Sequence, residues 1–124
     1  MKINKNDVPV IMEAPGTKMR TISGFGGMDV NYHDLPEGTD FTPLLKGLNN
    51  NSCHCPHYGY ILDGKMKVIY DDGKEEILES GDIFYLPKGH TAIVKANLKM
   101  IDFSPSKEHN EVLSHVAEMM SKMG

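Results

Sequence analysis

The sequence has little positive charge of the kind that binds phosphate. Arg20 is its only arginine among 124 residues, and the formal net charge is −4. Nucleic-acid binding needs a concentrated basic face that neutralises phosphates, and bidentate phosphate clamps are built from arginine. We therefore expect no nucleic-acid partner.

Long apolar runs are also absent. No stretch approaches the roughly 20 apolar residues that span a bilayer, and the opening MKINKNDVPV lacks the apolar core of a signal peptide. We expect no membrane association and a cytoplasmic location. In that reducing compartment the only two cysteines, Cys53 and Cys55, are more naturally metal ligands, reactive thiols or packing residues than a disulfide.

The remaining composition is ordinary for a globular protein, with 40% hydrophobic and 24% charged residues. A chain of this length is one domain by size, and we predict a single domain over residues 1–124. Short β-prone runs alternate with turn signals at intervals of about 8–12 residues, which predicts an all-β barrel or sandwich over residues 8–103. Asp63 and Gly64 are interpreted as a hairpin turn, and Ala96 and Asn97 as the break between two later strands.

Residues 107–123 depart from this β pattern. Apolar side chains recur there with a period of 3.6 residues on one face, and Ser106 is a suitable N-cap. We predict an amphipathic C-terminal helix whose apolar face closes the open side of the barrel or meets a second subunit. The apolar positions are Val112, Leu113, Val116, Met119, Met120 and Met123.

The densest group of metal-binding side-chain types is the run C-H-C-P-H, with Cys53, His54, Cys55 and His57. Thiolates and imidazoles are typical ligands of zinc and copper. If this run is a strand with a period of two, the two cysteines and His57 share one face and His54 points the other way. Pro56 leaves an alternative open, because a proline can introduce a bulge that turns His54 inward in place of Cys53 or His57.

A second segment, residues 81–90, has a distinctive spacing of glycine and proline. Gly81 is followed at fixed intervals by Pro87 and Gly89, and 16 residues, 65–80, separate it from Gly64. Residues 51–103, which contain both segments, resemble a small single-domain cupin. The resemblance implies an all-β, cupin-type jelly-roll barrel, to which this chain adds the C-terminal α-helix.

The usual metal ligands of that family are not at their expected positions. His57 stands where the family's first motif has its Glu, and Cys53 and Asn51 stand where it has two His. In the second motif Ala92 occupies the usual His position, and His90, two residues earlier, offers an imidazole instead. The family's site of three His and one Glu therefore does not carry over to this chain.

We predict instead that Cys53, Cys55, His57 and His90 form a metal site inside the barrel. Two thiolates and two imidazoles suit a divalent metal, with zinc favoured and iron or copper as alternatives. This ligand set resembles a cupin subgroup with C-x-C-P-H and P-x-G-H. The simplest alternative is that both cysteines are small buried apolar residues without a metal.

The other aromatic and histidine side chains give weaker signals. The remaining histidines are interpreted as surface or flanking residues: His33, His109 and His115. Four tyrosines in the β-prone runs are interpreted as sheet packing: Tyr58, Tyr60, Tyr70 and Tyr85.

Two classes of function fit these features. The first is a metal-dependent enzyme acting on a small polar metabolite in the barrel cavity, with the dioxygenase, isomerase or lyase chemistry that the resemblance implies. The second is a non-catalytic module that binds or senses a small ligand or metal through a structural zinc site. Four protein ligands would favour the second class, whereas three leave a position for water or substrate. Thiol chemistry at Cys53 and Cys55 is a third possibility. We expect a homodimer and a small-molecule ligand or substrate as partners.

Overall fold

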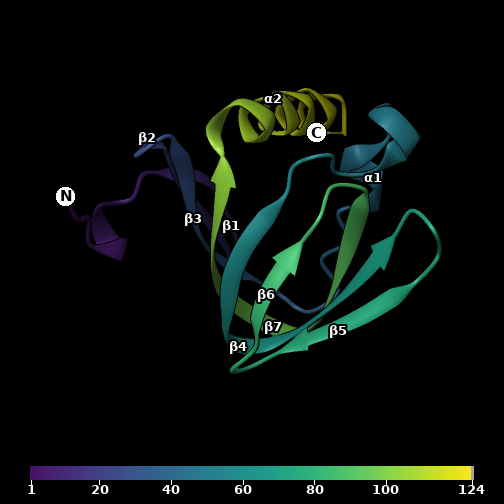
Figure 1. Ribbon diagram of the computed structural model, residues 1–124, viewed down its shortest axis with the longest axis horizontal. Helices are drawn as coiled ribbons and strands as arrows, with labels where there is room; N and C mark the ends of the chain where they lie inside the picture. Colours follow the sequence, from purple (N-terminus) through teal and green to yellow (C-terminus); the bar gives the residue numbers. More distant parts are fainter. Residues whose placement is uncertain (124) are drawn as a thin grey trace.

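An antiparallel sheet that curls on itself forms the body of the computed structural model, which describes residues 1–123 (Figure 1). The strand order is β1-β2-β3-β7-β4-β5, and β6 pairs with β4. The strands are β1 (Val10–Ala14), β2 (Thr17–Phe25), β3 (Met28–Leu35), β4 (His57–Tyr70), β5 (Glu75–Glu79), β6 (Ile83–Leu86) and β7 (His90–Pro105). The helical elements are η1 (Lys5–Asp7), α1 (Thr42–Leu45), η2 (Asn49–Asn51) and α2 (Ser106–Met123). The predicted all-β fold with a C-terminal α-helix is confirmed.

Two expected strand breaks are wrong. Asp63 and Gly64 lie inside the 14-residue strand β4, and Ala96 and Asn97 lie inside the 16-residue strand β7. The pairing of these two strands shifts register at three places between residues 61 and 66. Such bulges bend a strand without ending it, and they use the same glycine-rich sequences as hairpin turns.

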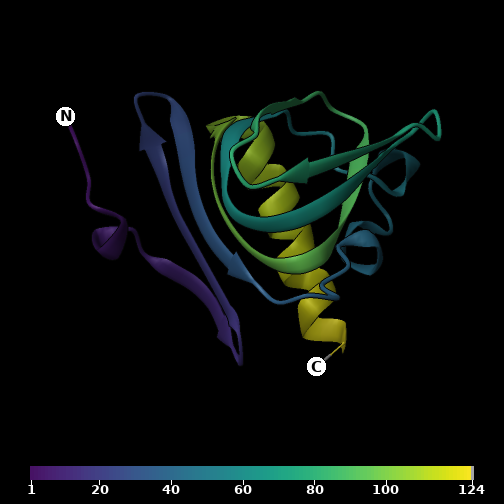
Figure 2. The ribbon, with the colours of Figure 1, turned by 90° about the horizontal axis from the view of Figure 1, so that it is seen from below.

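Gly64 forms the bend in β4. Its φ is +91°, and a Cβ atom at this position would collide with the backbone carbonyl of Asn97 on β7. Glycine alone combines this left-handed backbone with so close an approach. The two strands therefore curve together around the interior, as Figure 2 shows.

The curvature brings the two ends of β7 to one place. His90 begins β7 and pairs with Tyr70 at the end of β4, while Phe103, near the end of β7, pairs with Tyr58 at the start of β4. The ring centroids of His57 and His90 are nevertheless only 5.2 Å apart. The barrel interior thus gathers residues that lie far apart along the same strands.

The C-terminal helix α2 lies across the open end of the curled sheet (Figure 1). Its Val112 is buried in a cluster with Leu45 of α1 and with the two cysteines. Burying a side chain of this kind stabilises the fold by about 1.5–3 kcal/mol. The Met123 side chain, predicted for the same face, lies outside the described residues. Within residues 1–123 no helix has the length and apolar character needed to cross a bilayer.

Gly64→Ala should lower the free energy of unfolding by about 3 kcal/mol or more, because it adds left-handed backbone strain to the collision with Asn97. Gly73→Ala is the matched control, since Gly73 has a φ of +88° but nothing within 4 Å of its Cβ position. The free energy of unfolding of this control should fall by only about 1 kcal/mol. Urea unfolding followed by circular dichroism measures both variants. Equal losses would contradict the role assigned to the contact between Gly64 and β7.

Candidate metal centre

Three side chains with metal-binding atoms converge on the barrel wall. The potential ligand atoms of Cys53, His57 and His90 all lie within 4.8 Å of one another. His57 and His90 begin β4 and β7, and Cys53 forms an isolated bridge with His90, whose carbonyl accepts a 2.7 Å hydrogen bond from the Cys53 N–H. Backbone pairing therefore fixes the positions of all three residues.

The spacing of the donor atoms suits a tetrahedral metal. Cys53 Sγ lies 3.5 Å from His57 Nε2. In a zinc site with metal–sulfur and metal–nitrogen bonds of about 2.3 and 2.0 Å, two such donors stand about 3.5 Å apart. Cys53 and His57 therefore already have the spacing of two ligands of one metal ion, and the ligand atom of His90 lies within 4.8 Å of both.

Both imidazoles are held through their other ring nitrogen. His57 Nδ1 lies 2.7 Å from Ser104 Oγ and 3.7 Å from Asp102 Oδ1. His90 Nδ1 lies 2.8 Å from the carbonyl oxygen of Pro87, to which it donates. Ligating histidines are oriented in this way by carboxylates, hydroxyls or carbonyls, which leaves Nε2 free for the metal.

The charges in this cluster favour the thiolate. Burial alone would raise the pKa of the Cys53 thiol, but hydrogen bonds and charge from His57 and His90 lower that pKa to about 5. Burial would likewise lower the pKa of His57, but Asp102 and Cys53 raise it to about 10. The thiolate is the form that binds a metal, and an incoming metal would displace the His57 proton.

Cys55 does not join this group. Its side chain is fully buried, and its Sγ lies 3.4 Å from the carbonyl oxygen of Pro56. Burial, followed by the charge of Cys53, raises the pKa of the Cys55 thiol to about 12. The expectation of a strand starting at Cys53 is wrong, because β4 begins only at His57. Period-two alternation therefore does not extend through Pro56.

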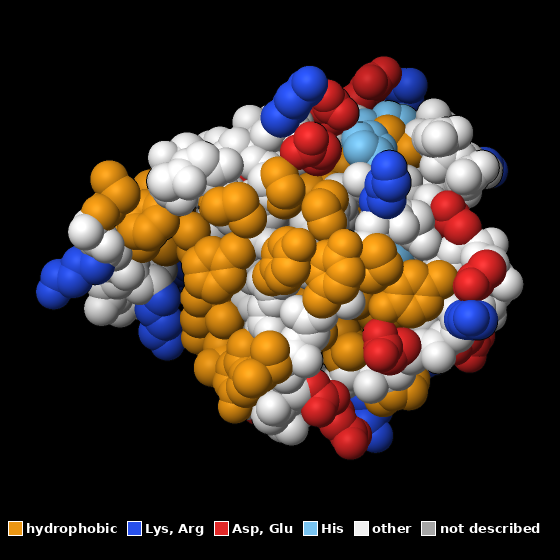
Figure 3. Space-filling model, viewed as in Figure 1, with side chains coloured by type: hydrophobic (Ala, Val, Ile, Leu, Met, Phe, Trp, Pro, Cys, Tyr) orange, Lys and Arg blue, Asp and Glu red, His pale blue; other side chains and the backbone are white. Residues whose placement is uncertain are grey.

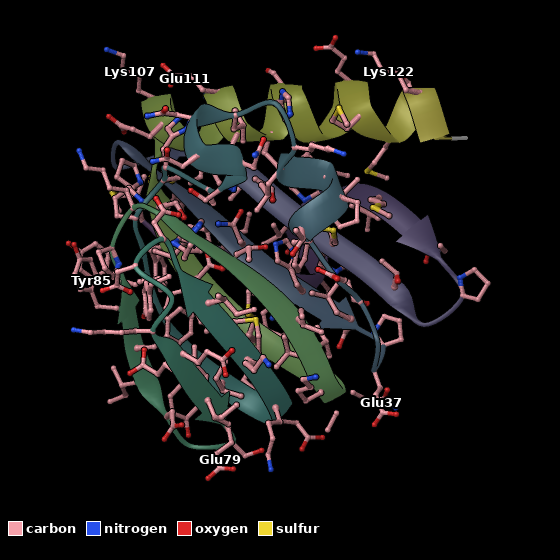
Figure 4. All side chains as sticks on the ribbon, turned by 90° about the vertical axis from the view of Figure 1, so that its right-hand side faces the viewer. Glu37, Glu79, Tyr85, Lys107, Glu111 and Lys122 are labelled. Atoms are coloured by element: carbon pink, nitrogen blue, oxygen red, sulfur yellow. The ribbon has the colours of Figure 1, made fainter. Side chains whose placement is uncertain are left out.

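His54 points away from the site, as the sequence pattern predicted. Its Nε2 lies 3.1 Å from Glu111 Oε2 on α2. Figure 4 shows Glu111 on the side of α2 that faces away from the sheet. The alternative in which His54 replaces Cys53 or His57 is therefore not the arrangement in this structure.

A buried polar network behind His57 was not predicted. Asp102 Oδ1 accepts hydrogen bonds from Asn31 Nδ2 at 2.5 Å and from Ser104 Oγ at 3.2 Å, and Thr21 Oγ1 lies 2.8 Å from Asn31 Oδ1. Burial would raise the pKa of Asp102, but His57 lowers it to about 2. One signal was available in the sequence: residues 102 and 104 are polar at alternating positions that continue the inward face of β7.

His33 and His109 are buried, so their interpretation as surface residues is wrong. His109 Nδ1 lies 2.6 Å from Asp29 Oδ2, which joins α2 to β3. His115, nearer the C-terminus of α2, has Nε2 2.7 Å from the Lys46 carbonyl oxygen. Neither histidine of α2 is among the three candidate ligands.

A cavity of about 120 Å³ adjoins the candidate ligands. Most of its wall is apolar and comes from the barrel strands and from α1 and α2. The polar side chains of the wall, apart from the candidate ligands, are Asn31, His33, Thr91, Asp102 and His109. A wider hollow of about 700 Å³ lies around His54 and Lys88, and it is not lined by any of the three candidate ligands.

Comparisons with known proteins agree with this architecture. Residues 52–102 match the family described as the EutQ-like cupin domain. The fold is similar to that of an RmlC-like cupin from Shewanella frigidimarina, with a TM-score of 0.59 and 18% identity over 86% of this chain and 92% of that one. It is also similar to the polyketide cyclase RemF from Streptomyces resistomycificus, with a TM-score of 0.57 and 16% identity over 86% of this chain and 79% of that one. A third similar structure is ectoine synthase from P. lautus, with a TM-score of 0.56 and 12% identity over 81% of this chain and 75% of that one. No curated protein matches the sequence. At these identities the likeness to the solved structures concerns the fold alone.

Asp29→Asn should reduce the acid sensitivity of the protein. Burial would raise the pKa of Asp29, but hydrogen bonds with Ser23, Ser106 and His109 hold it below the ordinary value of 3.8. A carboxyl group whose pKa is lower in the folded state stabilises the fold fully when the pH is above its pKa in the unfolded state. This stabilisation is lost as the pH falls through its pKa in the folded state. Below pH 4 the free energy of unfolding should therefore fall more steeply in the wild type than in Asp29→Asn.

The same variant should lower the free energy of unfolding by about 2–3 kcal/mol at pH 7, because it removes a buried charge-assisted hydrogen bond. Urea unfolding at a series of pH values measures both effects. Asp34→Asn, which changes a partly exposed carboxylate on the same strand, is the control and should follow the wild type. Parallel curves for Asp29→Asn and the wild type would contradict the prediction.

Proposed function

We propose that this chain, which is a small cupin domain, is a metal-dependent enzyme acting on a small metabolite in the barrel cavity. The proposal rests on the cluster of Cys53, His57 and His90 on the wall of that cavity. Three protein ligands leave a coordination position for water or substrate, which is the arrangement of catalytic zinc sites. The proteins with similar folds include a polyketide cyclase and an ectoine synthase. This supports a role as an enzyme but does not indicate which reaction it catalyses.

In this proposal the chain's own residues hold and tune the site. A bound divalent metal, with zinc favoured and iron or copper as alternatives, would polarise a substrate oxygen or lower the pKa of a bound water. Ser104 and Asp102 fix the orientation of the His57 ring, and the carbonyl of Pro87 fixes that of His90. The apolar wall excludes bulk water, which strengthens the electrostatic interactions inside. A reducing compartment such as the cytoplasm, where we place the protein, would keep the Cys53 thiolate available.

The second candidate is a closed zinc site with a structural or sensing role. Cys55 is packed in the same apolar cluster as Cys53, so it is the side chain that would supply a fourth ligand. Four protein ligands would leave no position for a substrate. The effect of removing Cys55 therefore separates the two candidates.

We predict about one divalent metal per chain in protein purified without a histidine tag, measured by inductively coupled plasma mass spectrometry. Cys53→Ser, His57→Ala and His90→Ala should each lower metal occupancy about tenfold or more, because each removes one of three ligands. His54→Ala is the matched control, since this neighbouring histidine points toward Glu111 and should keep full occupancy. Full occupancy in all of the ligand variants would contradict the metal site.

Cys55→Ser should keep its metal if the site is open, because Cys55 Sγ is directed at the Pro56 carbonyl. In cobalt-substituted protein, added azide should then change the visible spectrum by binding at the open position. Loss of metal in Cys55→Ser, together with a spectrum that azide does not change, would favour the closed structural site.

We also propose that the outer face of the barrel pairs with a second copy of the chain. Uncharged side chains gather on the outer face of β4, β6 and β7, where Figure 3 shows a broad hydrophobic area and Figure 4 shows Tyr85 projecting from the sheet. Strand pairing places Tyr58 beside both Tyr85 and Phe103. The tyrosine rings at 58 and 85 stack with centroids 4.7 Å apart. The outer patch comprises Tyr58, Tyr60, Leu62, Ile83, Tyr85 and Phe103, which are 39–86% exposed.

The size and chemistry of this outer patch suit an isologous dimer. Because a Tyr or Phe side chain carries about 200 Å² of surface, the six side chains expose on the order of 500 Å². A standard interface buries about 800 Å² on each partner, with an apolar centre and a polar rim. None of the six side chains carries a charge, so a two-fold axis through the outer patch would bury no like charges against each other.

Light scattering coupled to gel filtration should give a mass of twice 13.8 kDa for the wild type. Tyr85→Glu and Ile83→Glu should each give the monomer mass, because they place a charge in the centre of the interface. Ile11→Glu changes an apolar residue of β1 that is 47% exposed, close to the 52% of Tyr85, and is the control that should stay dimeric. A monomeric wild type, or a dimer that only Ile11→Glu breaks, would refute this interface.

A further inference from the structure

His33 is a buried polar side chain that lacks a partner. The residue is 6% exposed, and among the described residues its Nδ1 is the single fully buried side-chain nitrogen or oxygen without a hydrogen bond. The backbone of Tyr32 lies near enough to affect the His33 pKa but does not form a hydrogen bond with suitable geometry. An unpaired buried polar atom costs about 1–3 kcal/mol, and its presence requires an explanation.

The position of His33 connects this observation to the candidate site. His33 lines the same cavity as Cys53, His57 and His90. On β3 it lies two residues beyond Asn31, on the same inward face, and Asn31 is bonded to Asp102 in the network behind His57. One inward face of β3 therefore leads from the polar network into the cavity, over about 7 Å of strand.

Among the described residues, none forms a hydrogen bond with His33 Nδ1. Its neighbours across the sheet are Met19 on β2 and Met100 on β7, and both methionines line the cavity. Further apolar side chains of the wall include Phe41, Met66 and Phe84. A ligand in this cavity would therefore meet an apolar surface with an imidazole on it.

We propose that this cavity binds a short, uncharged, largely apolar molecule whose carbonyl or hydroxyl group forms a hydrogen bond with His33. This inference deepens the proposed function, on which it rests for the role of the metal, by naming the substrate class. His33 is then a binding residue on the wall of the cavity that the candidate metal ligands also line.

The size and charge of the site limit the ligand. A cavity of about 150 Å³ holds one benzene molecule, so the 120 Å³ here suits about five or six non-hydrogen atoms. Burial lowers the pKa of His33, so its ring is neutral and offers one donor and one acceptor. Asp102 places a carboxylate on the same wall, and it would repel an anionic ligand. The Asp102 carboxylate is already hydrogen-bonded to Asn31 and Ser104, which leaves it a poor partner for a cation.

The test uses three probes of equal size on the purified full-length protein, with its metal content recorded: 2-pentanone, butyrate and pentylammonium. We expect 2-pentanone to bind and to shift the ¹⁵N resonances of the His33 ring, which report directly on its hydrogen bonding. The two charged probes should bind at least about tenfold more weakly, because the apolar wall does not replace their hydration.

His33→Leu separates a binding role from a structural one. It keeps a similar volume, removes both ring nitrogens, and should weaken 2-pentanone binding about tenfold. Without ligand this variant should be at least as stable as the wild type, because it removes an unpaired polar group. His115→Leu is the matched control, since this histidine of α2 bonds the Lys46 carbonyl outside the cavity and should not change probe affinity.

The outcomes distinguish this inference from the proposed function. Equal 2-pentanone affinity in His33→Leu and the wild type, or tighter binding of butyrate or the ammonium probe that is itself weakened by His33→Leu, overturns the inference whatever the metal content. Protein that holds no metal but binds 2-pentanone through His33 would refute the metal-dependent function and support the inference.

Discussion

The shared bend of β4 and β7 is the constraint on which the candidate site depends. In an extended strand the 14 residue steps from His90 to Ser104 would span about 46 Å. In this structure both residues contact His57, one through a ring contact at 5.2 Å and the other through a 2.7 Å hydrogen bond. The bulges near Gly64 make this possible, because they let β7 approach β4 closely while the two strands stay paired. The geometry of the candidate site and the closure of the barrel thus have one physical origin.

Alternation along β4 gives one short segment two roles. From residue 57 to residue 62, before the bulges, successive side chains point into the barrel and out of it. His57 therefore reaches the candidate metal centre, and its neighbour Tyr58 lies in the outer patch. A side chain would not fit at Gly59, because Phe84 and Asp102 occupy the space that its Cβ would need. A substitution in this segment consequently affects either the site or the proposed dimer, according to its parity.

The interior is more polar than a stability argument alone would favour. Asp102, Asn31 and Ser104 are nearly fully buried, and well-packed apolar residues of similar volume often stabilise a core at least as well. Their hydrogen bonds hold His57 in one orientation, which an apolar core could not do. His33 is a further buried polar side chain on the cavity wall, and its Nδ1 has no hydrogen-bond partner. These buried polar residues, which are costly to stability, therefore lie next to the candidate metal centre.

The sequence alone was enough to predict the β class and the C-terminal helix, because these follow from local periodicity and side-chain type. It also marked the Cys and His run as a candidate metal site. The tertiary structure was needed to show that Cys55 Sγ is not among the clustered ligand atoms of Cys53, His57 and His90, since the chain before His57 is not a strand. It likewise decided that Gly64 bends a strand and that His33 is buried. Bulges and hairpin turns share the same local residues, and burial depends on pairing between strands distant in sequence, so neither could be predicted from neighbouring residues alone.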